Sequence, residues 1–194
     1  MAIASDSAVR KLALTDAREE EAAQRLFEST VKDALTSVHN RRYLLERLTT
    51  ELSFAERHDD TIAVLVVDID HFKQINDEHG HHVGDAVLRV VAAVIQRVLR
   101  PEDLLARYGG DEFVVLTRRI TQQNARILAE RLRAHVAGID LPLPGTHQLT
   151  VSVGLRCAGP GQFPSAPEEL LTEADSAMYE AKQNGRNCVV ERER

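Results

Sequence analysis

Two adjacent carboxylates, Asp111 and Glu112, follow Gly109 and Gly110 between two short apolar runs. Two glycines between strand-like runs predict a tight hairpin, because glycine supplies the positive φ that such turns require. The hairpin itself has no need of the acids, which are poor strand formers and costly to bury unless they are paired or bound to a metal. Surface hairpins often carry an acid after such glycines, so these residues alone leave a structural and a functional interpretation open.

A second pair of acids, Asp68 and Asp70, ends an unbroken apolar run over residues 62–67. A mostly β-branched run of this length predicts a strand buried on both faces. Its end should lie at the rim of the sheet, where the N–H groups of the helix expected over residues 71–77 can hold phosphate oxygens. We expect one of the two acids to cap that helix, but capping does not explain both.

If the buried strand lies beside the hairpin, Asp68 and Asp111 face each other across one rim of the sheet. Carboxylates gathered there, with Lys73 near, would form a site for Mg²⁺ bound to a nucleoside triphosphate. Two such ions can activate an attacking hydroxyl and stabilise a leaving pyrophosphate. The chemistry that this arrangement implies is transfer at a phosphorus.

The elements that must position these residues form an α/β (α+β) sandwich. Its mixed, largely antiparallel sheet carries helices on its faces. A turn over residues 80–85 should precede one of the helices, and residues 188–190 should form an edge strand. The periodicity predicts helices over residues 41–57, 86–99, 121–136 and 167–183, and a further strand over 149–155.

Residues 15–31 have a helical pattern with one apolar seam and interspersed charges, typical of an exposed helix or a short coiled-coil stalk. The alternative is a helix that packs on its own domain. We therefore divide the chain into a possible signalling stalk, residues 1–32, and a catalytic domain, residues 33–194.

The composition restricts the classes of partner. The 194 residues have a formal net charge of −6, which gives little support to a nucleic-acid partner. No apolar stretch reaches the roughly 18–20 residues of a membrane span, and we expect a soluble, cytoplasmic fragment. Cys157 and Cys188 have no CxxC pairing, and His79, His81 and His82 lack the spacing of zinc pairs, so we expect structural or solvent-facing histidines.

From about residue 33 to residue 190, the chain resembles a GGDEF domain of the diguanylate cyclase family. The resemblance implies the palm-like sheet shared with adenylyl cyclases and polymerases. The matching stretches are Asp33-Ala34-Leu35-Thr36, Asn40-Arg41-Arg42, Asp68-Ile69-Asp70-His71-Phe72-Lys73, Asn76-Asp77, Gly80-His81, Gly84-Asp85, Arg107-Tyr108-Gly109-Gly110-Asp111-Glu112-Phe113, Ser152-Val153-Gly154, Ala174-Asp175, Met178-Tyr179, Ala181-Lys182 and Gly185-Arg186-Asn187.

The resemblance implies that two facing domains, each holding one GTP, join the nucleotides into cyclic di-GMP and release two pyrophosphates. By position in the motifs, Asp68, the carbonyl of Ile69 and Asp111 would bind two Mg²⁺ ions, with Mn²⁺ possible. Asp111 or Glu112 would help to deprotonate the attacking hydroxyl. The protein would thus act as a homodimer controlled by an upstream sensor or receiver module.

The same resemblance assigns the nucleotide contacts. Asn76 and Asp85 would bind the guanine edge, because an acceptor carboxylate suits the N1–H and 2-amino donors of guanine and adenine has no such pair. Gly109 and Gly110 would leave room for the nucleotide near the backbone. The β- and γ-phosphates would be held by Lys73, Lys182 and Arg186 together with the N–H groups of Phe72 and Lys73.

Arg100 and Asp103 match the RxxD inhibitory site of the family, where the product binds and holds domains apart. A helix end followed by a proline stop is the structural alternative. Two positions depart from the family pattern: Ser37-Val38 replaces Gly-Leu, and Asp111 stands where many members have Glu. The first concerns the joint with the stalk, and the second is a variant that the family accepts.

Three other functions stay open at this point. A catalytically silent module that binds GTP or cyclic di-GMP would not need all of the acids, and a purely structural dimerisation unit would need none. An enzyme that makes cyclic GMP-AMP would want a smaller polar residue than Asp85. The helix before residue 33 indicates an output domain of a longer protein, or a short protein whose input is unseen.

Overall fold

The computed structural model describes residues 28–141 and 148–192. Its elements are, in chain order, β1 (His39–Asn40), α2 (Arg41–His58), β2 (Ile62–Ile69), α3 (Phe72–His79), α4 (His81–Val98), β3 (Leu104–Arg107), β4 (Glu112–Arg118), α5 (Gln122–Ala137), β5 (Val151–Ala158), α6 (Pro167–Gln183) and β6 (Val189–Arg192). The predicted stalk helix lies mostly outside the described residues, and only its end, residues 28–31, is described as helical.

One six-stranded sheet has the order β1-β3-β4-β2-β5-β6. The central strand β2 is antiparallel to both neighbours, β4 and β5, and β3 is antiparallel to β4. The outer strands β1 and β6 pair in parallel with β3 and β5. The predicted sheet, mixed and largely antiparallel with a C-terminal edge strand, is therefore confirmed.

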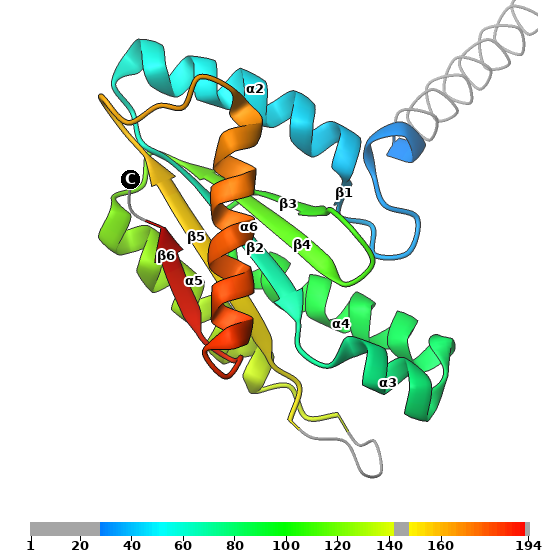
Figure 1. The fold of residues 1–194 in the computed structure, drawn as a ribbon. Coiled ribbons are helices and arrows are strands. Elements are labelled where there is room, and N and C mark those ends of the chain that lie inside the picture. Colours follow the sequence, from blue (N-terminus) through cyan, green and yellow to red (C-terminus); the bar gives the residue numbers. More distant parts are fainter. Residues whose placement is uncertain (1–27, 142–147, 193–194) are drawn as a thin grey trace, which may run out of the picture.

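Helices cover both faces of the sheet, so that the domain has three layers (Figure 1). The odd-numbered residues of β2, from Ala63 to Ile69, join the core formed with α4 and α5. The even-numbered residues Ile62, Val64 and Val66 join the core formed with α2 and α6. Because side chains alternate between the faces of a strand, the next even residue, Asp68, lies on the α6 face.

Two sequence-based elements, α4 and β5, differ from the structure by more than two residues at one end. The turn expected over residues 80–85 is wrong, because α4 begins at His81, directly after Gly80 ends α3 with φ 83°. Gly84 does not break the helix. A Cβ at this position would lie 2.0 Å from Oδ1 of Asn76, so the glycine permits α3 and α4 to pack closely. β5 begins two residues later and ends three residues later than expected.

Among the described helices, none combines the length and the apolar character that crossing a bilayer would require.

Candidate active site

The carboxylates meet at the end of the β2–β4 ladder. Asp68 lies opposite Glu112 in the antiparallel register, and the N–H of Ile69 donates to the Asp111 carbonyl at 3.3 Å. Glu112 is two residues before Val114 on β4 and shares the α6 face with it. The expectation that the buried strand lies beside the hairpin is confirmed, and it brings three acids to one rim.

Lys182 brings a positive charge to this rim. Its Nζ lies 2.8 Å from Oδ2 of Asp68, and the lysine is near the end of α6. α6 can lie this close to the sheet because of Gly154, where an added Cβ would meet the Ala174 carbonyl at 2.0 Å and the Met178 nitrogen at 2.2 Å. The structure therefore places Lys182, predicted to hold phosphates, directly against a predicted metal ligand.

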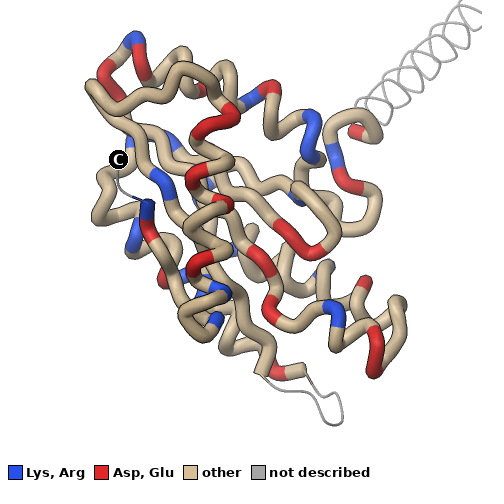
Figure 2. The backbone as a smooth tube through the Cα atoms, in the orientation of Figure 1, with Lys and Arg blue, Asp and Glu red and all other residues tan. Residues whose placement is uncertain are grey.

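Burial and neighbouring charges raise the pKa values of Asp68 and Glu112 at this rim. Burial, together with the charges of Asp111 and Glu112, raises the pKa of Asp68 to about 6, although Lys182 opposes the shift. Burial and the charges of Asp175 and Asp111 also raise the pKa of Glu112. Acidic segments gather on α6, on the hairpin turn and at the end of β2 (Figure 2). Negative charge at the rim exceeds the local positive charge, and a bound cation would relieve this excess.

Asp70, which is only 4% exposed, has a supporting role. Its carboxylate accepts hydrogen bonds from the hydroxyls of Thr150 and Ser152, both at 2.7 Å, and from the N–H of Asn187 at 3.0 Å. The prediction that one of the two acids caps the following helix is wrong, because His71 is the N-cap residue of α3 and makes no capping hydrogen bond with its side chain. Asp70 instead ties β2 to β5 and to the loop after α6.

The predicted guanine contacts lie on the helical pair α3 and α4. Gly84 packs against Asn76, and Asp85 follows in the second turn of α4. Both side chains are half-buried, and within the described residues neither makes a hydrogen bond or an ion pair. Their polar atoms are thus available to a ligand.

The remaining predicted phosphate contacts flank the rim. Lys73 is exposed in the first turn of α3, next to the half-buried Phe72. Arg186 is exposed in the loop after α6, with φ 64°, and the hydrogen bond from Asn187 to Asp70 holds this loop against the sheet. Neither cation pairs with a carboxylate in the described part of the chain.

The hairpin forms as expected, but the reason given for its glycines is wrong. Neither Gly109 nor Gly110 has a positive φ. A Cβ at Gly109 would lie 2.7 Å from Oε2 of Glu112, whereas a Cβ at Gly110 would meet no atom within 4 Å. The atom close to Gly109 is the end of the Glu112 side chain, and a small movement of that carboxylate would relieve the contact.

The acids at the rim suit Mg²⁺, which prefers carboxylate oxygens at one or two positions together with waters and substrate phosphates. Within the described residues, no three His, Cys, Asp or Glu side chains form a ready-made metal cage. Asp68, Asp111 and the Ile69 carbonyl would therefore hold the ions together with nucleotide oxygens. His81 and His82, by contrast, are exposed on α4.

Arg100 and Asp103 lie away from this rim, between α4 and the start of β3. The Asp103 carboxylate accepts from the N–H of Arg100 at 2.9 Å, which closes a turn directly after α4. The turn borders a hollow of about 180 Å³ that is also lined by Asn124, Ile127 and Arg131 of α5. The sequence interpretation did not include Arg131, which brings a second guanidinium to this hollow.

Comparison with known families identifies the domain. The family model described as "Diguanylate cyclase, GGDEF domain" matches residues 30–188. The chain belongs to the GGDEF family. Several GGDEF proteins resemble it over most of its length. The chain is 40% identical to the response regulator PleD of Caulobacter vibrioides and to the probable diguanylate cyclase DgcT of Escherichia coli, in each case over 84% of the chain.

The matched region covers 36% of PleD and 36% of DgcT, so the chain spans about a third of the length of these curated relatives. Among solved structures, the coiled coil and GGDEF domain of DgcB from Caulobacter crescentus, in complex with c-di-GMP, matches with a TM-score of 0.85 at 32% identity. That match covers 96% of this chain and 98% of the DgcB chain. The palm-like fold expected from the resemblance is confirmed.

Some supporting residues of this GGDEF domain were not assigned a role from the sequence. Gly84 and Gly154 were noted only as parts of motifs, although both decide how closely a helix approaches the site. Arg107 was noted in the same way, and its contacts with the hairpin turn are described below. Gly154, inside a predicted strand, was the available signal, because such a glycine points to a close approach of another segment, whereas Gly84 lay in the predicted turn.

Proposed function

We propose that the protein is a diguanylate cyclase that condenses two GTP molecules into cyclic di-GMP with release of two pyrophosphates, across a homodimer of domains. The observation that carries the proposal is the meeting of Asp68, Asp111 and Glu112 at one rim, with raised pKa values at Asp68 and Glu112. Such an excess of carboxylates is expected where a site binds metal-complexed phosphates.

The residues at the site have separate roles in binding and in catalysis. Lys73, Lys182 and Arg186 hold the β- and γ-phosphates and compensate the charge of the leaving pyrophosphate. Asn76 and Asp85 orient the guanine. Glu112 or Asp111 accepts the proton of the attacking 3′-hydroxyl, and the raised pKa of Glu112 suits a proton acceptor. Bound Mg²⁺, or Mn²⁺, would polarise the phosphate oxygens and lower the pKa of the hydroxyl.

Each domain has one such rim, and the reaction needs two nucleotides. The 3′-hydroxyl of one GTP attacks the α-phosphorus of the other, and the bond to pyrophosphate breaks as the new ester bond forms. Two attacks in opposite directions close the ring. A homodimer of facing domains supplies both nucleotides in the required orientation.

The test is incubation of concentrated protein with GTP and Mg²⁺, followed by chromatography of the nucleotides. We expect cyclic di-GMP from the parent chain and a loss on the order of a thousandfold in Asp111→Asn, because a metal ligand is removed. Asp60→Asn, which removes a carboxylate beside the other end of β2, is the matched control and should keep the parent rate. A mixed product on addition of ATP would contradict the role of Asp85.

A silent binding module is the alternative function. It predicts that GTP or cyclic di-GMP binds but that GTP is never converted, even when the domains are forced into a dimer. That result would overturn the cyclase proposal.

We also propose that the hollow beside Arg100 and Asp103 binds cyclic di-GMP and inhibits the enzyme. Its two guanidinium groups, from Arg100 and Arg131, suit the phosphates of a cyclic dinucleotide. Arg100→Ala should lower the inhibition by added cyclic di-GMP at least about tenfold without lowering the initial rate. Equal inhibition of the variant and the parent would contradict this site.

An attached sensor or receiver module would regulate the domain through residues 1–32, proposed as the stalk. Three names of relatives support this view. PleD is a response regulator, the DgcB structure includes a coiled coil, and SiaD of Pseudomonas aeruginosa was solved with its activator SiaC.

A further inference from the structure

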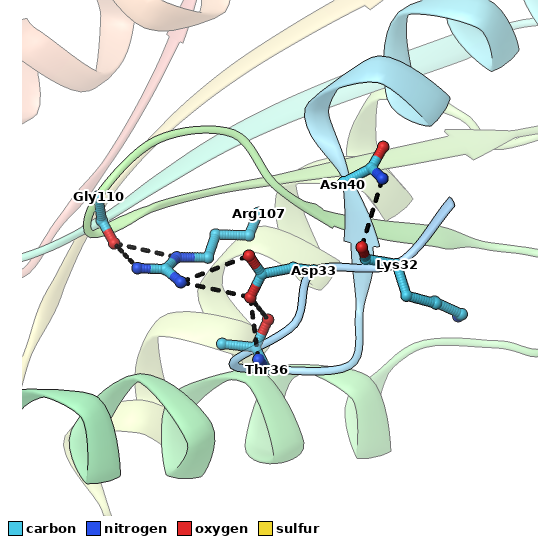
Figure 3. A network of polar contacts seen from close by, with 6 residues as sticks. All are labelled: Lys32, Asp33, Thr36, Asn40, Arg107 and Gly110. Carbon is cyan, nitrogen blue, oxygen red and sulfur yellow. Dashed lines mark hydrogen bonds and ion pairs between the residues drawn. The ribbon is translucent and has the colours of Figure 1, made fainter. Parts of the chain in front are cut away.

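The Arg107 guanidinium joins two parts of the chain that are far apart in sequence (Figure 3). Its Nε and Nη2 both donate to the Gly110 carbonyl, at 3.1 and 2.7 Å. Its Nη1 donates to Oδ1 of Asp33 at 3.3 Å. One side chain thus contacts the residue before Asp111 and the segment that leads into the domain.

Asp33 is itself held in place by the turn over residues 33–38. It accepts hydrogen bonds from the N–H of Thr36 at 2.9 Å and from the Thr36 hydroxyl at 2.7 Å. Backbone hydrogen bonds of 2.8 Å with Val38 and 2.9 Å with Ser37 close the turn. Burial would raise the pKa of the Asp33 carboxyl, but the Thr36 hydrogen bonds and the Arg107 charge together lower it. The carboxylate therefore stays charged at neutral pH.

The hairpin tip has little other support. Its backbone bonds run from the N–H groups of Tyr108 and Gly109 to the Glu112 carbonyl, at 2.9 and 3.4 Å, and from the N–H of Ile69 to the Asp111 carbonyl, at 3.3 Å. Among the described residues, Arg107 alone hydrogen-bonds through its side chain to the backbone of residues 108–111. Arg41 contacts the Tyr108 side chain rather than the backbone, and its charge acts on Glu112. Arg107 therefore fixes the direction of the peptide that precedes Asp111.

We propose that Arg107 is a positioning residue for Asp111 and Glu112, and that Asp33 acts through Arg107 to tie the turn over residues 33–38 to the hairpin tip. The proposal rests on the cyclase function proposed above. It assigns the 33–38 turn a mechanical role, because a displacement of that turn would move the guanidinium that holds the Gly110 carbonyl. An arginine suits this role because its planar fork makes two parallel bonds, whereas a lysine offers one point charge.

Two measurements test the proposal in Arg107→Lys, Asp33→Asn and the double variant. The first is backbone hydrogen exchange of residues 108–112 without nucleotide, and the second is the steady-state rate of cyclic di-GMP formation. Asp33→Asn keeps an oxygen for Thr36 and weakens only the ion pair. Each variant should speed exchange at the tip about fivefold and lower kcat about tenfold, with KM for GTP within twofold.

The control is Asp60→Asn, which breaks a comparable pair, Asp60 with Arg119 at 3.1 Å, beside the other end of β4. It should change neither measurement. If Asp33 acts through Arg107, the double variant should behave like Arg107→Lys alone, because the second change then removes nothing further. Additive effects would show that Asp33 acts by another route.

The two measurements separate this proposal from the cyclase assignment. Unchanged exchange in an active chain would overturn the role of Arg107 and leave the cyclase standing. An inactive parent chain whose hairpin exchange still responds would overturn the cyclase assignment, while the Arg107 contact with the turn would stand. A fall in unfolding temperature equal to that of Asp60→Asn, with no exchange response, would reduce Arg107 to a structural residue.

Discussion

The two ends of the β2–β4 ladder treat acidic side chains in opposite ways. Beside the end where Ile62 pairs with Arg118, Glu51 of α2 is 7% exposed and contacts two arginines. Arg118 donates to its Oε2 at 2.9 Å, and Arg47 makes a second, short contact with Oε1. One buried acid at this end has two cations.

At the other end, Lys182 pairs directly with Asp68, and the more distant charges of Lys182 and Arg41 act on Glu112. The pKa values of Asp68 and Glu112 are raised there, so ionisation of these acids at neutral pH lowers the free energy of unfolding. The same two strands, β2 and β4, form both ends of the ladder. The difference therefore lies in the charges supplied by the surrounding elements.

Charges that stabilise the fold thus differ from charges that the protein leaves uncompensated and that a ligand can compensate. Compensated acids such as Glu51 stabilise the native state, and their loss leaves unpaired cations. The acids at the rim are under-compensated, so a bound cation or a metal-complexed phosphate would complete their environment. Neutralising one carboxylate should therefore lower the free energy of unfolding at the Glu51 end and leave it level or raise it at the rim.

The largest expected effect comes from neutralising one acid at each end. Glu112→Gln should lower the rate of cyclic di-GMP formation at least about a hundredfold, while the free energy of unfolding stays level or rises. Glu51→Gln should keep the rate within about twofold and lower the free energy of unfolding by about 1–3 kcal/mol, less than for a fully buried pair because both arginines are partly exposed.

Turnover and urea denaturation of both variants measure this contrast. A loss of stability in Glu112→Gln that equals the loss in Glu51→Gln would break the comparison, because both acids would then be structural. A large loss of turnover in Glu51→Gln with an unchanged free energy of unfolding would also contradict the comparison, because Glu51 would then act in the reaction rather than in the fold.

The rim could be predicted because its signals are local in sequence. An unbroken apolar run ending in Asp68, and a hairpin followed by Asp111 and Glu112, leave few sheet arrangements in which the acids do not meet. The exact register could not be predicted, because the short hairpin fixes only the pairing of β3 with β4, and the β2–β4 ladder places Glu112 rather than Asp111 opposite Asp68. The type and the order of the elements, in contrast, could be predicted from the sequence.

The supporting contacts could not be predicted, because they depend on distances between segments. The bond from Asn187 to Asp70 spans 117 positions, and the ion pair of Arg107 with Asp33 spans 74. Gly109 shows the same limit. The pattern predicts a positive φ at the glycines, but neither Gly109 nor Gly110 has one, and the Glu112 carboxylate lies beside Gly109. Close packing, which a pattern does not encode, decides such cases.

The smallest expected effect sharpens the comparison through pH. The pKa of Asp68 is raised from its ordinary 3.8 to about 6, so the folded state binds this proton more tightly than the unfolded state does. The resulting stability is complete below about pH 4 and is lost as the pH rises through 6. Asp68→Asn cannot ionise, so its unfolding midpoint should equal that of the parent near pH 4 and exceed it above pH 7.

The shift corresponds to at most about 3 kcal/mol, and screening by solvent lowers the expectation to about 1–2 kcal/mol, or about 2–6 °C. Thermal unfolding in a chelator between pH 4 and 8 measures the difference, and Asp60→Asn should show no such dependence.

Addition of Mg²⁺ and GTP at pH 8 should then raise the midpoint of the parent and leave Asp68→Asn nearly unchanged, because ligands stabilise only the chain that binds them. A variant that is less stable than the parent at pH 8 in the chelator would mean that Lys182 fully compensates Asp68, and the two ends of the ladder would no longer differ in kind.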